Sequence, residues 1–335
     1  MYFSVMNLLR VIARKIIFPV LMKVRIDRLL IHMSNKKVLH VMYHGVVDEV
    51  FVEFSGRHLD AKQFEQQVVY LKKNFEIITV REAFNNDLRS GRTKVALSFD
   101  DGFLNNLHFA LPILEKHEVP ATFFVSTTTL VANHFVWAEA VAAARYFYPQ
   151  ANFRFDEERF VAWVSTADQA SISNYIKSLC KVDRDRLLNQ LEQQFQLSEK
   201  MKDIDPKYWR LMTAEELRLF AGSPLVEIGS HAHEHYNLAN LTLTEAKEDL
   251  GTSKNLLEQQ LGCKVDLLAY PDGSYTREVV KLAYELSFEK QLAVRYRNRE
   301  DMADHRIMDR FGVSTTTTFE SNMLNLVLQL FKKNS

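Results

Sequence analysis

Residues 95–103 read Val95-Ala96-Leu97-Ser98-Phe99-Asp100-Asp101-Gly102-Phe103. The apolar start predicts a buried strand, and this strand ends on two adjacent carboxylates and a glycine. Successive side chains of a strand point to opposite sides, so Asp100 and Asp101 need not have the same role. Gly102 would let the chain turn sharply and approach a ligand closely. Taken alone, such a stretch is more often an ordinary strand followed by an Asp-Gly turn.

A second strand-to-loop stretch, far downstream, changes that interpretation. It reads Val226-Glu227-Ile228-Gly229-Ser230-His231-Ala232-His233-Glu234-His235. His231 and His235 are four residues apart, so one helical turn would place both imidazoles on the same side. Two imidazoles and a carboxylate suit zinc and related divalent ions, and they leave open positions for water. A histidine-rich loop could also be a solvated surface. Because the two loops supply complementary ligands, we expect a metal site.

Strand and helix patterns alternate between residues 38 and 125, which predicts parallel strands covered by helices, as in an α/β fold. The first strand pattern covers residues 37–47, and His44 falls near its end. A lone histidine at such a place is more often structural than catalytic. A later strand pattern runs into Pro271-Asp272-Gly273, a third polar turn at a strand end.

The alternation stops between about residues 127 and 212, where helical patterns predict a largely helical insertion. All three tryptophans fall in this region. Trp163 and Trp209 are expected to pack inside the insertion. Trp137 follows soon after a strand end, and it could equally pack there or stack against a sugar ring of a substrate.

Residues 1–37 are apolar with interspersed basic side chains. The charges interrupt every apolar run before it reaches the ~20 residues that a spanning helix needs, and no cleavable signal peptide is recognised. A basic amphipathic helix, kinked at Pro19, could lie on an anionic membrane. It could equally pack on the main domain with a solvated basic face. We therefore expect the protein in the cytoplasm or peripherally on the inner face of the cytoplasmic membrane.

The composition excludes some classes of protein. Lys and Arg number 42 and so do Asp and Glu, so the net charge gives no case for nucleic-acid binding. The two cysteines, Cys180 and Cys263, lie in no paired motif. We therefore expect neither a disulfide framework nor a thiolate metal site.

Three motifs resemble those of the polysaccharide deacetylases, the NodB-homology family of esterases. They are Leu97-Ser98-Phe99-Asp100-Asp101-Gly102, Ser230-His231-Ala232-His233-Glu234-His235 and Tyr270-Pro271-Asp272-Gly273, in that order. The resemblance implies a deacetylase domain over residues 38–335, with the insertion inside it. It also implies a distorted (β/α) barrel whose active site lies at the C-terminal ends of the strands.

The resemblance implies a metal site and a base. Asp101, His231 and His235 would hold a divalent metal, with zinc preferred and cobalt or nickel as alternatives. Asp100 would be the general base that accepts a proton from a metal-bound water. The backbone N–H of Asp272 would help to stabilise the oxyanion that the attack creates.

The remaining site residues are the substrate contacts and two departures from the common pattern. Tyr270, Pro271 and Trp137 are the expected substrate contacts.

The first departure concerns the general acid. Many members carry it on a late histidine, and we find no matching segment here. A branch acting on poly-N-acetylglucosamine carries it on an early strand in a Tyr-His context. Met42-Tyr43-His44-Gly45 resembles that context, so His44 is the candidate acid.

The second departure concerns the arginine that pairs with the base in many members. Ala269 stands at that position here, and Arg310 is the candidate replacement; an ordinary ion pair is the alternative role of Arg310. Ala232 also replaces the usual hydroxyl residue after the first histidine, which removes a hydrogen bond that would stabilise the loop.

The motifs together imply a metal-dependent hydrolase that removes N-acetyl groups from a saccharide. The expected substrate is a cell-surface polysaccharide or its lipid-linked precursor. Two alternatives stay open: a catalytically silent glycan-binding or assembly protein on the same fold, and an O-acetyl esterase that uses the same site.

Overall fold

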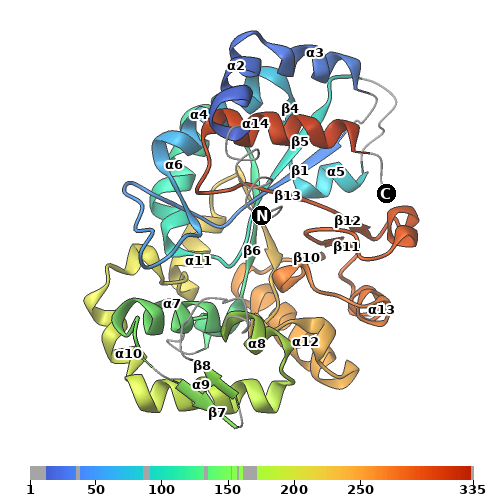
Figure 1. Ribbon diagram of the computed structural model, residues 1–335. Helices are drawn as coiled ribbons and strands as arrows, with labels where there is room; N and C mark the ends of the chain where they lie inside the picture. Colours follow the sequence, from blue (N-terminus) through green and yellow to red (C-terminus); the bar gives the residue numbers. More distant parts are fainter. Residues whose placement is uncertain are drawn as a thin grey trace.

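The computed structural model describes residues 13–34, 38–85, 91–131, 135–151, 153–156, 158–160 and 172–332. A curled sheet of parallel strands forms its centre (Figure 1). The described residues contribute nine strands to this sheet: β1 (Val38–Tyr43), β4 (Glu76–Ile78), β5 (Lys94–Phe99), β6 (Ala121–Val125), β9 (Val226–Ser230), β10 (Leu267–Ala269), β11 (Lys290–Leu292), β12 (Ile307–Met308) and β13 (Phe311–Gly312).

One extended segment joins the two edges of the sheet. The strand order is β12-β11-β10-β9-β6-β5-β1-β13, with β4 paired to β5 outside this path. The outer strands β12 and β13 are separated in sequence only by Asp309 and Arg310. Because β12 pairs with β11 and β13 pairs with β1, the sheet curls into a distorted barrel, as the sequence predicted. Arg310 therefore lies between the two edges.

Side chains of β5 alternate between the helix-covered core and the interior of the barrel. Val95, Leu97 and Phe99 belong to the large core cluster between sheet and helices, whereas Ala96 packs in a smaller cluster with residues of β10 and β11. Asp100 follows Ala96 and Ser98 in this alternation and is 3% exposed. The alternation therefore directs the Asp100 carboxylate into the barrel.

Helices cover the outside of the sheet and begin at side-chain caps. The Asp60 side chain accepts a hydrogen bond from the Gln63 N–H at the start of α4, and Thr213 and Thr242 form capping boxes at α11 and α12. These helices and their neighbours are α4 (Ala61–Asn74), α5 (Val80–Asn85), a π-helical turn at Asn106–Ala110, α6 (Leu111–His117), α11 (Ala214–Ala221), α12 (Leu243–Leu261) and α13 (Arg277–Glu285). A short parallel pair, β2 (Gly45–Val47) and β3 (His58–Asp60), follows β1.

The N-terminal segment breaks at Arg25 rather than at Pro19. A π-helical turn at Ala13–Ile17 leads into α2 (Phe18–Lys23), and α3 (Ile26–Met33) follows; residues 1–12 of the expected helix lie outside the described residues. Pro19 is the second residue of α2 and directly follows the π-helical turn. Arg25 adopts a left-handed conformation with φ 62° and so ends the helix.

The α2–α3 pair packs on the C-terminal helix α14 (Phe319–Leu328), as Figure 1 shows at one end of the sheet. Asp27 is buried there and accepts a hydrogen bond from the Tyr70 hydroxyl at 2.7 Å. Among the described residues, no helix is both long and apolar enough to cross a membrane.

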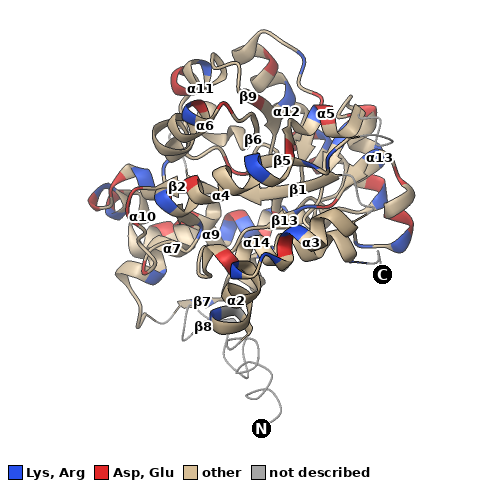
Figure 2. Ribbon diagram, turned by 90° about the horizontal axis from the view of Figure 1, so that it is seen from above, with Lys and Arg blue, Asp and Glu red and all other residues tan. Residues whose placement is uncertain are grey.

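The described residues between 127 and 212 lie outside the main sheet, at the end opposite α14 (Figure 1). They contain α7 (Trp137–Phe147), α8 (Ile172–Ser178), α9 (Lys181–Phe195), α10 (Leu197–Lys200) and a hairpin of β7 (Phe153–Phe155) and β8 (Glu158–Phe160) that the sequence did not predict. This region has its own apolar core, against which Trp209 packs. Trp163 lies outside the described residues. Figure 2 shows basic and acidic residues interspersed over the ribbon.

Short 3-10 turns complete the chain at Thr127–Leu130, Met201–Asp203, Pro206–Tyr208, Leu238–Asn240, Pro271–Gly273, Arg299–Ala303 and Gln329–Phe331.

Candidate active site

The carboxyl ends of the parallel strands meet the insertion at a cavity of about 450 Å³. His44 follows β1, Asp100 and Asp101 follow β5, His231 follows β9, and Asp272 belongs to the turn after β10. All five line the cavity. Because parallel strands end at one edge of a sheet, polar residues far apart in sequence meet there.

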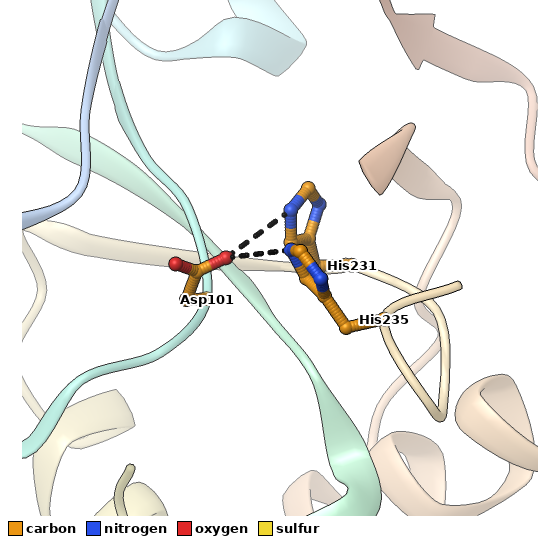
Figure 3. Close-up of side chains that lie close together, drawn as sticks. All are labelled: Asp101, His231 and His235. Carbon is orange, nitrogen blue, oxygen red and sulfur yellow. Dashed lines mark ion pairs between the residues drawn. The ribbon is translucent and has the colours of Figure 1, made fainter. Parts of the chain in front are cut away.

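Asp101, His231 and His235 form one compact cluster (Figure 3). The Asp101 Oδ1 atom lies 3.0 Å from His235 Nε2 and 3.4 Å from His231 Nε2. One ligand atom from each residue can be chosen so that all three lie within 4.8 Å of one another. All three side chains are buried, and buried groups of this kind are costly unless they are paired or bind a metal.

The donor set fits a divalent ion. The His231 Nδ1 atom lies 2.8 Å from the Ala269 carbonyl oxygen, to which it can donate only as Nδ1–H. That tautomer leaves the Nε2 lone pair facing Asp101, an arrangement typical of metal-ligating histidines. The Asp101 Oδ1 atom is buried and has no hydrogen-bond donor within the described chain. An ion placed among the three residues would satisfy it.

The histidine loop is not the helical turn that the spacing predicted. Ala232 and His235 both have left-handed φ values, 62° and 55°, and no helix covers residues 231–237. The loop is held instead by Asp249 of α12, whose carboxylate accepts hydrogen bonds from the His233 and Glu234 N–H groups at 2.8 and 3.0 Å. These bonds fix the backbone so that the two imidazoles converge.

Other hydroxyls support the loop even though Ala232 lacks one. The Ser230 hydroxyl accepts a hydrogen bond from the Ala232 N–H at 3.1 Å, and the Ser126 hydroxyl donates to the His231 carbonyl oxygen at 3.1 Å. The bond expected to be lost at position 232 is therefore replaced from two neighbouring strand ends. Asp101 itself has a φ of 74°, which turns its side chain away from that of Asp100.

Asp100 and Arg310 form a buried bidentate ion pair. Arg310 Nη1 and Nη2 lie 2.6 and 2.8 Å from the two carboxylate oxygens, and Nη1 also lies 3.3 Å from the Ser98 hydroxyl. Burial alone would raise the pKa of Asp100, but the charges of Arg310 and His231 outweigh it and lower that pKa below its usual value. Arg310, the candidate partner of the base, thus pairs with Asp100.

His44 lies beside these carboxylates at the end of β1. Burial lowers the pKa of His44, although the charges of Asp101 and Asp100 act in the opposite direction. The next residue is Gly45, where a Cβ atom would come within 2.2 Å of His58 Nδ1. Only glycine permits this close packing, which fixes the backbone beside His44.

Asp272 is held from across the cavity by the insertion. Its φ is 56°, and its Oδ1 atom lies 2.6 Å from Lys177 Nζ of α8. Lys177 also lies over the Trp137 ring, 5.9 Å from its centroid. Sequence reasoning missed Lys177, because nothing in the sequence relates α8 to a turn almost a hundred residues later.

Trp137 lines the cavity and also supports a metal-site residue. Its Nε1–H donates to the His235 carbonyl oxygen at 3.0 Å, and its side chain is almost fully buried. Trp137 thus packs in the insertion core, as one alternative predicted, and it also lines the cavity; stacking against a sugar ring stays a prediction.

Tyr270 and Pro271 do not line the cavity, so the expectation that they contact substrate needs correction. Tyr270 has no exposed surface, its hydroxyl donates to Gln291, and its ring stacks on Tyr275. Pro271 is also buried and begins the turn that positions Asp272. Their place in the motif thus reflects packing behind the site.

A second ion pair borders the metal site and was not predicted. Arg57 lies in the loop before β3, and its guanidinium contacts the carboxylate of Glu139 from α7. A second nitrogen of Arg57 is 4.0 Å from Asp101 Oδ2. Burial raises the pKa of Glu139 to about 7, even though Arg57 lowers it. No sequence pattern indicated this ion pair, because Arg57 and Glu139 both lie outside the three motifs.

Comparison with known proteins agrees with this geometry. The family model for polysaccharide deacetylases matches residues 88–290, which is more than half of the chain. The chain therefore belongs to the polysaccharide deacetylase family, and it is a deacetylase. The Bacillus subtilis protein YxkH, whose name carries the same family description, is 20% identical over 284 residues, or 82% of this chain and 72% of YxkH.

Solved structures share the fold at low identity. The Streptococcus pyogenes deacetylase PplD in complex with acetate has a TM-score of 0.57 at 16% identity, over 87% of this chain and 98% of PplD. IcaB from Ammonifex degensii has a TM-score of 0.55 at 17% identity, over 89% and 99%. A de-N-acetylase from Aggregatibacter actinomycetemcomitans has a TM-score of 0.54 at 16% identity, over 86% and 99%.

Proposed function

We propose that the protein is a metal-dependent hydrolase that removes N-acetyl groups from a saccharide. The observation that carries this proposal is the adjacency of two buried units: the Asp101–His231–His235 cluster and the Asp100–Arg310 ion pair. The first has the composition of a catalytic zinc site with three protein ligands. The second presents an ionised carboxylate next to it, as a general base requires.

Each residue would have one task. A divalent ion, when bound, would activate the attacking water and polarise the acetyl carbonyl. Asp100 would accept the proton of that water, and Arg310 would keep the carboxylate ionised and correctly oriented. The N–H of Asp272 would donate a hydrogen bond to the oxyanion. His44 would give a proton to the departing amine, which leaves poorly without one.

Two of the structural neighbours support the choice of acetyl transfer to water. PplD was solved with acetate, the acid that deacetylation releases, and another neighbour is a de-N-acetylase. We propose zinc as the resident ion because a carboxylate with two imidazoles suits it; cobalt and nickel are the alternatives. As substrate we propose a cell-surface polysaccharide or its lipid-linked precursor.

Peripheral contact with an anionic membrane belongs to the same proposal. Val20, Val24 and Met33 are each more than half exposed on the α2–α3 segment, and Lys23 and Arg28 lie among them. Exposed apolar side chains with basic neighbours favour binding at the surface of an anionic bilayer. Such binding would bring the site close to a lipid-linked substrate.

Vesicle sedimentation tests the membrane contact. A Val20→Glu/Val24→Glu double variant should lose binding to anionic vesicles, whereas Val182→Glu, at a residue of α9 that is at least as exposed, should keep it. Equal binding by all three proteins, or no binding by the unaltered protein, rejects the contact.

Acetate release tests the activity. Purified protein with added zinc or cobalt would be incubated with a panel of N-acetylated glycans, and Asp100→Asn should reduce release by roughly 10²-fold or more. Asp48→Asn, at an exposed residue that pairs with Lys207, is the matched control and should change little. If no glycan yields acetate while a divalent ion is bound, the glycan-binding alternative replaces this proposal.

A further inference from the structure

Most of the charged side chains that line the active-site cavity have a partner of opposite charge. Asp100 is paired with Arg310, and Asp272 is paired with Lys177. Asp101 faces the two histidines, and Arg57 is paired with the buried Glu139. These groups form a balanced set around the metal site.

Arg145 is the exception among the described residues that line the cavity. Its Nη2–H donates to the Phe54 carbonyl oxygen at 2.9 Å, and no carboxylate of the described chain lies within ion-pair distance of it. It is only partly exposed, and Arg57 lies near enough to act on its charge. Arg57 is already paired with Glu139, so Arg145 is the cation on this side of the cavity whose charge an added anion would compensate.

The wall is built to hold both cations in place. Trp137, Val141 and Arg145 are spaced by four residues along α7, so they share one face of the helix, and all three line the cavity. The loop that Arg145 contacts through Phe54 also carries Arg57. Arg57 and Arg145 thus flank one surface, which we call the arginine wall (Phe54, Arg57, Val141 and Arg145).

We propose that the arginine wall binds an anionic group, a phosphate or a carboxylate, carried by the acetylated saccharide. The inference rests on the proposed function and narrows its substrate class to acidic or phosphate-bearing glycans. Arg145 is about 12 Å along the α7 axis from Trp137, which contacts His235. The anionic group would therefore lie on a part of the substrate away from the acetyl group that is removed.

Guanidinium groups suit this ligand. They present several N–H donors in a fixed plane and bind phosphate or carboxylate in a bidentate manner. Among the described residues, the Phe54 carbonyl engages one nitrogen of Arg145, and the other N–H groups of its guanidinium can bind such an anion. A neutral acetylated sugar would leave this cation without a partner.

Calorimetric binding tests the proposal on full-length, zinc-loaded protein. All proteins would carry Asp100→Asn so that the probes stay intact. The probes are a neutral N-acetylated disaccharide, the same disaccharide bearing a phosphate, and the same disaccharide bearing a carboxylate. We expect at least one anionic probe to bind about tenfold more tightly than the neutral one, and increasing salt to reduce the difference. The two anionic probes distinguish phosphate from carboxylate.

Variants of Arg145 separate charge from packing. Arg145→Gln should remove the preference, whereas Arg145→Lys should keep most of it because the charge remains. Arg218→Gln changes an exposed residue of α11, and this variant should bind the three probes as tightly as the protein with the unaltered arginine wall. Equal binding of neutral and anionic probes, no binding of either anionic probe, or an undiminished preference in Arg145→Gln overturns the proposal.

The same probes, given to protein that retains Asp100, separate this inference from the proposed function. Preference for the anionic probes without any acetate release would keep the anion site and reject the deacetylation of these saccharides. Acetate release from all three probes at equal rates, with no preference in binding, would support the deacetylation and reject the anion site.

Discussion

The two walls of the active-site cavity differ in how deeply their polar side chains are buried and how tightly these side chains are held. The strand-end wall consists of His44, Asp100, Asp101, His231 and Asp272, and the insertion wall consists of Trp137, Arg145 and Lys177. Asp100, Asp101 and His231 are at most 3% exposed. On the insertion wall, the Lys177 side chain is 36% exposed and is held by its ion pair with Asp272 and its contact with the Trp137 ring.

From this difference we infer that the strand-end wall carries the chemistry and that the insertion wall recognises the rest of the substrate. Reactive groups must be held within a fraction of an ångström, and the ends of rigid parallel strands provide that precision. Groups that recognise the rest of a substrate tolerate more freedom. We therefore expect changes in the strand-end wall to affect turnover and changes in the insertion wall to affect affinity and specificity.

The largest effect is expected from Asp101→Asn. An amide is a weaker ligand than a carboxylate and carries no charge, so metal affinity should fall by at least about a hundredfold. Metal analysis after dialysis measures this loss directly, and acetate release should fall with it. Asp48→Asn is again the control. Full metal content in Asp101→Asn would contradict the assignment of Asp101 as a ligand.

His44→Ala should produce the next largest effect, and it should depend on the leaving group. Loss of a general acid costs about 10²- to 10⁴-fold when a poor leaving group must be protonated. Acetate release from an N-acetylated glycan should therefore fall far more than release from an activated aryl ester. An equal loss on both substrates would show that His44 is not the acid.

Arg310→Gln should move the pH profile. Asp100 must be ionised to act as a base, so kcat/KM falls as the pH drops through the pKa of Asp100. Arg310 lowers that pKa, so its removal should shift the acidic limb to higher pH. Arg310→Lys, which keeps the charge, should shift the limb less.

Arg306→Gln is the matched control, because Arg306 pairs with Asp304 instead of lining the cavity. An acidic limb that stays in place in Arg310→Gln would contradict the role given to the Asp100–Arg310 ion pair.

The smallest effect is expected from Lys177→Met on the insertion wall. A partly exposed ion pair contributes about 1 kcal/mol or less, so KM should rise by a few fold while kcat stays nearly constant. Lys202→Met, at an exposed lysine of the insertion, should leave both parameters unchanged. A large fall in kcat would give Lys177 a part in the chemistry and remove the proposed difference between the walls.

Much of the strand-end wall was predictable from local patterns together with the resemblance of three motifs to the polysaccharide deacetylases. The alternation of strands and helices between residues 38 and 125 predicted the parallel sheet. The alternation of strand side chains meant that Asp100 and Asp101 need not have the same role, and their carboxylates do face different partners. Ala269 drew attention to a missing cation, and Arg310 lies where one is needed.

The rest depends on contacts that no local pattern records. Arg57 meets Glu139, Lys177 meets Asp272, and Asp249 holds the histidine loop, each across a long separation in sequence. The helical turn expected for His231 and His235 was wrong because left-handed residues and the Asp249 carboxylate shape that loop.

Restoration of acetate release by returned metal tests the central claim most directly. Protein would be stripped with a chelator and then titrated with zinc in the presence of an N-acetylated glycan that supports turnover. We predict that activity is lost on stripping and returns in proportion to bound zinc, reaching its maximum at an equimolar amount. Undiminished acetate release from protein that holds no divalent ion would contradict the account.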